Sequence, residues 1–183
     1  MKLPSLFLGC LFLLIGINSI QSQSPVDYVN MMIGTDGAHR TEYGGIVPSV
    51  TQPFGMTSWC AVTRENRISR TMYHHKDETL QGFMASHQPC IWMGDYGFMT
   101  FMPQINSLKI EKEARKVKLD RDQEIATPYY YKVTYPGDAQ HTITTEFTAT
   151  SRASYFRIHY PEKQKAILYL EAGREEDGGG IEI

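Results

Sequence analysis

Short apolar stretches separated by turn residues run along most of the chain, and this pattern indicates an antiparallel β protein. The stretches are rich in Thr, Tyr, Phe, Val and Ile, which favour strands. Their spacing is typical of a mainly β fold built as an antiparallel β-sandwich. Strands are predicted over Met56–Val62, Thr79–Ser86, Tyr96–Met102, Tyr129–Tyr135, Thr142–Ala149, Ser154–Tyr160 and Ala166–Glu171.

The clearest alternation lies in the segment YFRIHY, residues 155–160. Successive side chains of a strand point to opposite faces. One face is therefore expected to carry Phe156, Ile158 and Tyr160, and the other Tyr155, Arg157 and His159. The turn sequence Pro136-Gly137-Asp138 predicts a hairpin connection between two of the strands.

Three stretches depart from this pattern. Ser24 can cap a helix, Pro25 suits its first position, and Gly34 can end it, so one short N-terminal helix is predicted. Thr35–Gln52 is a long turn-rich connection, and such connections are often functional. Leu108–Asp122 is highly charged with an ambiguous period, as in a solvated helix or polar strands. We expect strands at the domain edge.

The N-terminus has the pattern of a secretory signal peptide over residues 1–23. Lys2 precedes an apolar run, Leu6 to Ile17, that is too short to span a membrane. Small and polar residues follow, which favours cleavage near Ser22 to Ser24 over lipidation of Cys10. We therefore expect an exported protein, periplasmic, cell-surface or secreted, whose residues 24–183 form one domain.

Composition narrows the classes of function. The 183 residues are 42% hydrophobic and 21% charged, as in ordinary globular proteins, and the net charge is −2. Without a basic stripe, nucleic acid is not an expected partner. In an oxidising compartment Cys60 and Cys90 could pair as a disulfide, or both could be buried thiols.

The segment HQPCIWMGDYG, His87 to Gly97, is the most unusual stretch. With His74, His75 and Cys60 it offers metal ligands, but no recognised ligand spacing is present. A nucleophilic Cys90 beside His87 is disfavoured, because catalytic Cys and His generally come from distant segments.

Two residues of this segment suit the binding of a sugar. Asp95 could orient a ligand hydroxyl, or hold a turn through a side-chain bond to the backbone. The flat apolar ring of Trp92 could stack on a sugar, or fill the core.

Five segments in order, Val26–Gly37, Gly44–Trp59, His87–Gly97, Thr127–Tyr135 and Ile143–Pro161, resemble the N-terminal β-sandwich domain of glycoside hydrolase family 92. The resemblance covers nearly all of the mature chain. It implies a large exported, calcium-dependent exo-α-mannosidase that removes terminal α-linked mannose, often α-1,2-linked, with inversion. An (α/α)6 barrel supplies the general acid, the general base and most ligands of the Ca²⁺ ion.

That resemblance also implies which residues face the substrate. Trp92 and Asp95 are expected to line the sugar pocket, followed by His87 and Gly94, with no catalytic residue and no metal ligand assigned in this chain. Gly44 to Gly55 is expected to form a second segment of the interface with the barrel. Exposed apolar surface is expected around Trp59, Trp92 and Phe54.

The C-terminal stretch LEAGREEDGGGIEI ends in glycines without a closing element. We therefore expect an incomplete sandwich, a fragment that is inactive alone and whose partners are mannose-containing glycans and a missing C-terminal catalytic domain. The alternatives are a non-catalytic carbohydrate-binding module that binds through Trp92, and a structural envelope protein in which Trp92 is buried.

Overall fold

The computed structural model describes residues 24–37, 44–87, 92–93, 99–173 and 182. The described residues form three short helical segments: η1 (Pro25–Tyr28), α2 (Lys112–Arg115) and η2 (Arg121–Gln123). They also form β1 (Ser58–Val62), β2 (Thr79–Leu80), β3 (Gly82–Ser86), β4 (Met99–Ile105), β5 (Val117–Lys118), β6 (Glu124–Thr127), β7 (Tyr130–Pro136), β8 (Thr142–Ala149), β9 (Ser154–His159) and β10 (Ala166–Ala172).

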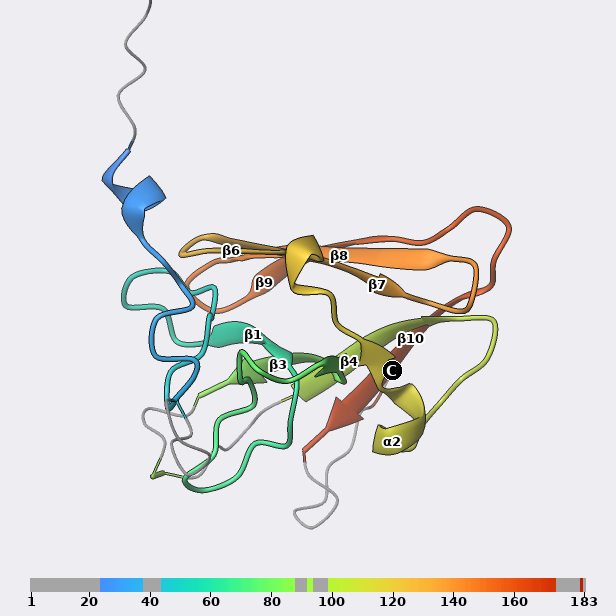
Figure 1. Cartoon of the computed structure of the whole chain (residues 1–183), viewed down its shortest axis with the longest axis horizontal. Helices are drawn as coiled ribbons and strands as arrows, with labels where there is room; N and C mark the ends of the chain where they lie inside the picture. The colour runs from blue at the N-terminus through green and yellow to red at the C-terminus, as the bar shows by residue number, and fades with distance from the viewer. Residues whose placement is uncertain (1–23, 38–43, 88–91, 94–98, 174–181, 183) are drawn as a thin grey trace, which may run out of the picture.

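The strands build two stacked layers (Figure 1). Sheet I has the order β1-β3-β4-β10, and sheet II has the order β6-β7-β8-β9. All pairings are antiparallel, and β2 and β5 form a small separate ladder. The predicted mainly β fold is therefore confirmed, with an architecture consistent with a β-sandwich.

The core lies between the two sheets, where each strand turns its apolar side chains inward. In β7 the residues Tyr131, Val133 and Tyr135 are buried, and those between them are partly exposed. Aromatic rings link the layers: the ring centroids of Phe83 and Phe147 lie 5.9 Å apart, edge to face. Such pairs stabilise a core beyond the area they bury, by about 1 kcal/mol each.

Most predicted strands agree with the observed ones to within two residues at each end. Thr142–Ala149 is confirmed at both ends, and Pro136-Gly137-Asp138 does begin the connection between β7 and β8. The stretch predicted as Thr79–Ser86 divides at Gln81, so Leu80 pairs with β5 and Phe83 with β4. The strand predicted as Tyr96–Met102 is observed as Met99–Ile105, and its predicted start lies outside the described residues.

The two remaining predictions need correction. The N-terminal helix is one 3-10 turn, because Val29 and Ile33 are 49% and 72% exposed and find no core to stabilise a longer helix. The charged stretch contains α2 and η2 besides β5, since the buried Arg115 holds a helical turn against the carbonyl of Ile110. Its strand paired with β2 agrees with the predicted edge position.

No helix in the described part of the chain is long and apolar enough to cross a bilayer. Residues 1–23, where the signal peptide is predicted, lie outside the described residues.

Candidate functional site

The connection between β3 and β4 carries Trp92, at the end of the sandwich where β1 begins. The last residue of β3, Ser86, lies opposite Ser58, the first residue of β1. The connection therefore leaves sheet I beside the loop that precedes β1. Trp92 is 71% exposed, and His87 is also exposed. Asp95, Gly94 and Cys90 lie outside the described residues.

The loop before β1 presents a second large apolar side chain at this end. Phe54 is fully exposed and adopts a left-handed φ of 61°, which is uncommon outside glycine. The N–H of Gly55 donates to the carbonyl of Gln52 at 2.7 Å, and that of Met56 to the carbonyl of Ser151 at 2.7 Å. The first bond closes the turn that contains Phe54, and the second joins the loop to the turn between β8 and β9.

Trp59, which was expected to be part of an exposed apolar surface, is buried. It is only 9% exposed and packs edge to face on Phe156, with 5.0 Å between ring centroids. Its position in β1 directs the ring between the sheets, so Trp59 belongs to the core. The predicted exposure of Trp92 and Phe54 is observed, and the exposed Trp92 also disfavours the structural protein in which it would be buried.

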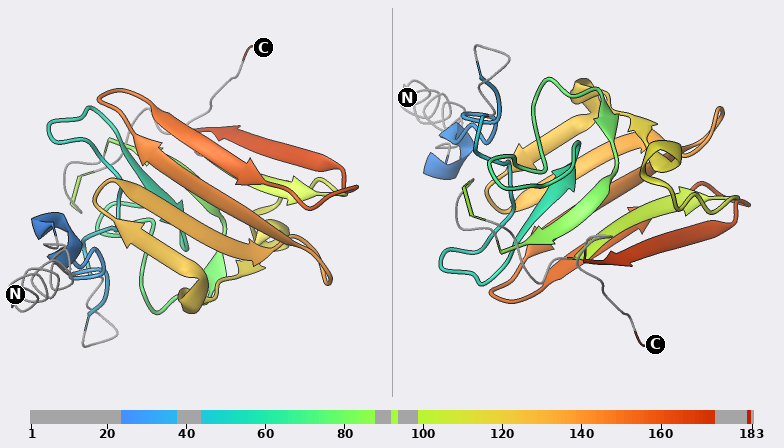
Figure 2. Two further views of the ribbon diagram at one scale, coloured as in Figure 1. Left: turned by 90° about the horizontal axis from the view of Figure 1, so that it is seen from above. Right: turned by 90° about the horizontal axis from the view of Figure 1, so that it is seen from below.

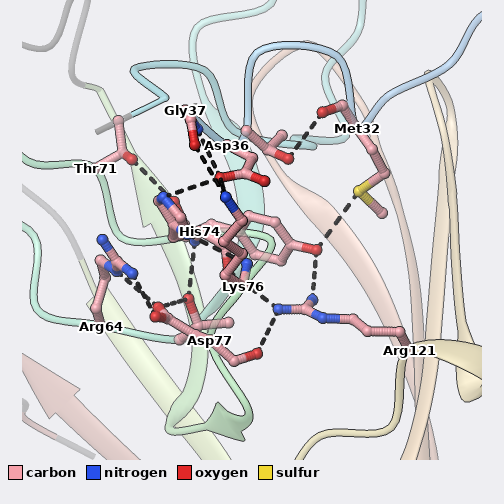
Figure 3. A network of polar contacts seen from close by, with 12 residues as sticks. Met32, Asp36, Gly37, Arg64, Thr71, His74, Lys76, Asp77 and Arg121 are labelled. Carbon is pink, nitrogen blue, oxygen red and sulfur yellow. Dashed lines mark hydrogen bonds and ion pairs between the residues drawn. The ribbon is translucent and has the colours of Figure 1, made fainter. Parts of the chain in front are cut away.

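A polar network holds the N-terminal segment against the connection between β1 and β2 (Figure 3). The N–H of His75 donates to the carbonyl of Thr35 at 3.0 Å. Lys76 Nζ donates to the carbonyl of Gly37 at 3.0 Å and forms an ion pair with Asp36 at the same distance. His74 Nε2 lies 3.6 Å from the Asp36 carboxylate.

The network continues from the N-terminal segment to sheet II. Asp77 forms an ion pair with Arg64 and accepts a hydrogen bond from Thr63 at 2.7 Å. Arg121, in η2, donates to the carbonyls of His74 at 3.0 Å and Asp77 at 2.7 Å. Three separate segments of the chain are thereby fixed relative to one another.

The charged groups of this network neutralise one another, and neither its two carboxylates nor the imidazole of His74 has a pKa shifted toward neutral pH, as a general acid or base would need. Burial alone would raise the pKa of Asp77, but hydrogen bonds from Arg64 and Thr63 outweigh it and lower that pKa. The same holds for Asp36, whose bonds from Lys76 and from the N–H of Gly37 outweigh burial and lower its pKa. Burial, followed by the charge of Arg64, lowers the pKa of His74. Two ionised carboxylates beside a neutral imidazole therefore indicate a structural role for this network.

The described residues do not fit a calcium site. Within the described ranges no three side chains of His, Cys, Asp or Glu gather as metal ligands. Asp36 and Asp77, the two carboxylates of the polar network, are already paired with the cationic side chains of Lys76 and Arg64.

Cys60 is a buried residue of the core. Burial, reinforced by the charge of Glu124, raises the pKa of its thiol well above the usual range, so it is a poor nucleophile. Cys90 lies outside the described residues, and the Cys60–Cys90 disulfide stays a prediction.

The sequence singled out Trp92, whose role in a sugar pocket stays a prediction, but it did not predict the polar network. Its partners are as far apart as Asp36 and Arg121, and no local spacing signals such contacts. The one usable signal was the length of the turn-rich connection, which predicted a functional role.

The sequence and the fold of this chain match those of known proteins. The sequence profile of the glycosyl hydrolase family 92 N-terminal domain matches residues 28–183. The family GH92 inverting mannosidase BT2199 from Bacteroides thetaiotaomicron is 36% identical, with a TM-score of 0.70 over 81% of this chain and 20% of that protein. The GH92 α-mannosidase BT3965 from the same organism, solved with mannoimidazole, is 30% identical, with a TM-score of 0.67 over 79% of this chain and 19% of that protein.

A search of curated proteins finds no match. The chain spans about a fifth of the length of the two mannosidases, which agree with it in fold and in sequence. The profile match covers most of the chain. The chain belongs to glycosyl hydrolase family 92, and residues 28–183 correspond to the N-terminal domain of that family.

Proposed function

We propose that this chain is the N-terminal domain of an exported α-mannosidase that removes terminal α-linked, often α-1,2-linked, mannose from glycans with inversion. The observation that carries the proposal is the 36% identity to an inverting GH92 mannosidase across 81% of the chain. Residues 24–183 act as this domain, and residues 1–23 act as the signal peptide.

The exposed end of the sandwich supports a role in forming a sugar pocket. Trp92 and Phe54 lie in two loops at the end of the sandwich where β1 begins, and both are largely uncovered. Large exposed apolar side chains at one end of a domain mark an interaction surface. We assign Trp92, with Asp95, His87 and Gly94 of the same connection, to the wall of the pocket. The Gly44 to Gly55 stretch packs against the catalytic domain.

The open side of the sandwich supports a further partner, the catalytic domain, packed against this one. Leu168 and Leu170 lie opposite Pro103 and Phe101 in sheet I, so their side chains point toward sheet II. They nevertheless remain 48% and 37% exposed. Inward-facing leucines with this exposure are expected where more protein covers the gap between the sheets.

In this proposal the catalytic domain supplies the general acid and the general base. An inverting glycosidase needs a general acid and a general base about 6.5–9.5 Å apart to admit a water molecule. The network carboxylates Asp36 and Asp77 are each paired with a cation and do not suit either role. A Ca²⁺ ion in the proposed enzyme would be bound mostly by residues outside this chain, where it would help to hold the sugar. This chain shapes and closes the pocket.

Two assays test the proposal. The isolated chain, with and without added calcium, should not hydrolyse 4-nitrophenyl α-mannoside. A chimera of BT2199 in which residues 28–183 of this chain replace the matching fifth should hydrolyse α-1,2-mannobiose. Turnover by the isolated chain would contradict the proposed division of labour. A folded chimera without turnover would contradict the proposed role of the domain.

The chimera also tests the pocket wall. Trp92→Ala should raise KM by about tenfold or more, the effect of losing one stacking ring. Lys118→Ala, an exposed change in β5, is the control and should leave kcat and KM unchanged. Equal kcat and KM values in the two variants would show that Trp92 does not line the pocket.

A further inference from the structure

The outer face of sheet II carries polar and aromatic side chains in register. Thr148 lies opposite Tyr155, Glu146 opposite Arg157, and Thr144 opposite His159. The residues between them, such as Phe147 and Phe156, turn inward and pack against each other at 4.9 Å between centroids. The left-hand view of Figure 2 looks onto this outer face of β6 to β9.

Glu146 is the centre of this face. Its carboxylate accepts a hydrogen bond from the hydroxyl of Tyr130 at 2.5 Å, and Arg157 Nη1 donates to it at 3.1 Å. His159 Nε2 lies 3.1 Å from the same carboxylate. These bonds, that of Tyr130 foremost, lower the pKa of Glu146 to about 2. The carboxylate is thus ionised and held in one position, although its side chain keeps 15% exposure.

A shallow hollow opens over this group. It has a volume of about 120 Å³ and is lined by Tyr130, Glu146, Phe147, Thr148, Tyr155 and Arg157. Tyr155 is 62% exposed, and its aromatic ring offers a flat apolar surface at the edge of the hollow. The Arg157 side chain is 61% exposed, and its guanidinium has more N–H groups than its bond to Glu146 uses.

We propose that this hollow is a second glycan-binding site, which takes a neutral hexopyranose unit. A pyranose ring has an apolar C–H face, which can stack on Tyr155, and a rim of hydroxyls that both donate and accept hydrogen bonds. Glu146 accepts from one hydroxyl, and Arg157 donates to its neighbour. The bonds from Tyr130 and His159 fix the carboxylate before the sugar arrives, which lowers the entropic cost of binding.

The charges in the hollow select a neutral ligand. A phosphate or carboxylate would meet the ionised Glu146, and a cation would meet Arg157. A polyol interacts favourably with both members of the pair. The arrangement follows the usual design of small-molecule sites, an apolar surface with a few fixed polar groups.

This site is separate from the surface assigned to the sugar pocket. Tyr155 and Arg157 lie on the outward face of β9 in sheet II, whereas Trp92 lies in a connection of sheet I. The choice of mannan as one probe and the role of the site in the enzyme rest on the proposed function. A site of this kind would hold the enzyme on a polymeric glycan while terminal units are removed elsewhere.

Affinity electrophoresis of the chain in native gels with yeast α-mannan, dextran or xylan tests the site. We expect at least one polysaccharide to retard the wild-type chain. Tyr155→Ala and Arg157→Ala should each weaken the apparent affinity by about tenfold, as expected for the loss of a stacking ring or a charged donor. Lys118→Ala changes the net charge as Arg157→Ala does and should bind like the wild type.

The remaining outcomes would overturn the proposal. Migration unaffected by all three polysaccharides would do so. So would retardation that Tyr155→Ala leaves unchanged and Trp92→Ala abolishes, because the sugar would then bind at the other end of the domain. Thermal unfolding of each variant verifies that it is folded, and replacement of the exposed Tyr155 should leave the melting temperature close to that of the wild type.

Discussion

The hydroxyl of Tyr131 donates a hydrogen bond to Glu124 at 2.6 Å within the core of the sandwich. The Glu124 side chain is only 1% exposed and also accepts bonds from Tyr73 at 2.9 Å and from Arg121 at 2.6 Å. A buried carboxylate is tolerated only when it is paired and hydrogen-bonded. Glu124 therefore links sheet II to the polar network that anchors the N-terminal segment.

Replacing this carboxylate should destabilise the domain strongly. Glu124→Gln removes the counter-charge of Arg121 and places amide N–H groups beside hydroxyl donors. The expected loss in the free energy of unfolding is about 3 kcal/mol, typical of breaking a buried pair. Urea unfolding followed by circular dichroism measures it.

Glu113→Gln is the matched control, because Glu113 is 82% exposed in its pair with Lys116. Surface pairs of this kind contribute less than about 1 kcal/mol. Equal unfolding midpoints for the Glu124→Gln and Glu113→Gln variants would show that the buried network adds nothing to stability.

Gly82 is the second position where a small change should have a large effect. It has a φ of 152°, and a Cβ added there would lie 2.7 Å from the carbonyl oxygen of Phe101. Because the contacted atom is backbone, Gly82→Ala must displace β4 or β3. We expect a loss of about 2 kcal/mol in the free energy of unfolding. Arg152→Ala, in an exposed turn, should cost less than about 0.5 kcal/mol, and an equally small cost for Gly82→Ala would contradict the close approach.

Local pattern predicted the parts of the fold that depend on neighbours in sequence. The alternation of residues 155–160 gave the correct faces of β9, with Phe156 and Ile158 turned toward the core and Arg157 outward. The same rule did not reveal that the chain breaks at Gln81 into two strands, because β2 pairs with β5 and β3 pairs with β1 and β4, which are distant in sequence.

For the candidate site, too, the sequence predicted some features and not others. The composition of the β3–β4 connection marked Trp92, and its exposure agrees with a surface role. Trp59 carried the same chemical signal but is a core residue, since the strand directs its ring inward onto Phe156. Residue type gave the candidates, and only tertiary packing separated the surface indole from the buried one.

Stability should fall as the pH is lowered from 7.5 to 5, in part through His74. Its Nδ1 accepts a hydrogen bond from the N–H of Lys76 at 3.2 Å, which requires the unprotonated nitrogen. Because burial lowers its pKa below the ordinary value near 6.5, the unfolded chain binds the proton more readily than the folded one. The stabilisation is complete above pH 6.5 and is lost as the pH falls toward the folded pKa.

Two measurements check this expectation. NMR titration of the His74 ring should give a pKa below 6.5. Unfolding of His74→Asn, which keeps an acceptor but does not titrate, should show a smaller loss of stability between pH 7.5 and 5 than the wild type shows. Identical pH dependence in the two proteins would exclude a contribution from His74.

The two tryptophans should differ sharply in their contact with water. Trp59→Phe leaves only Trp92, whose 71% exposure predicts red-shifted emission and strong quenching by acrylamide. Trp92→Phe leaves only Trp59, which is 9% exposed and should emit at shorter wavelength and resist the quencher. Removing the buried ring should also cost about 1–3 kcal/mol in the free energy of unfolding, whereas removing the surface ring should cost less than about 0.5 kcal/mol. Comparable quenching constants in the two variants would contradict the assignment of Trp92 to the surface of the domain and, with it, to the pocket wall.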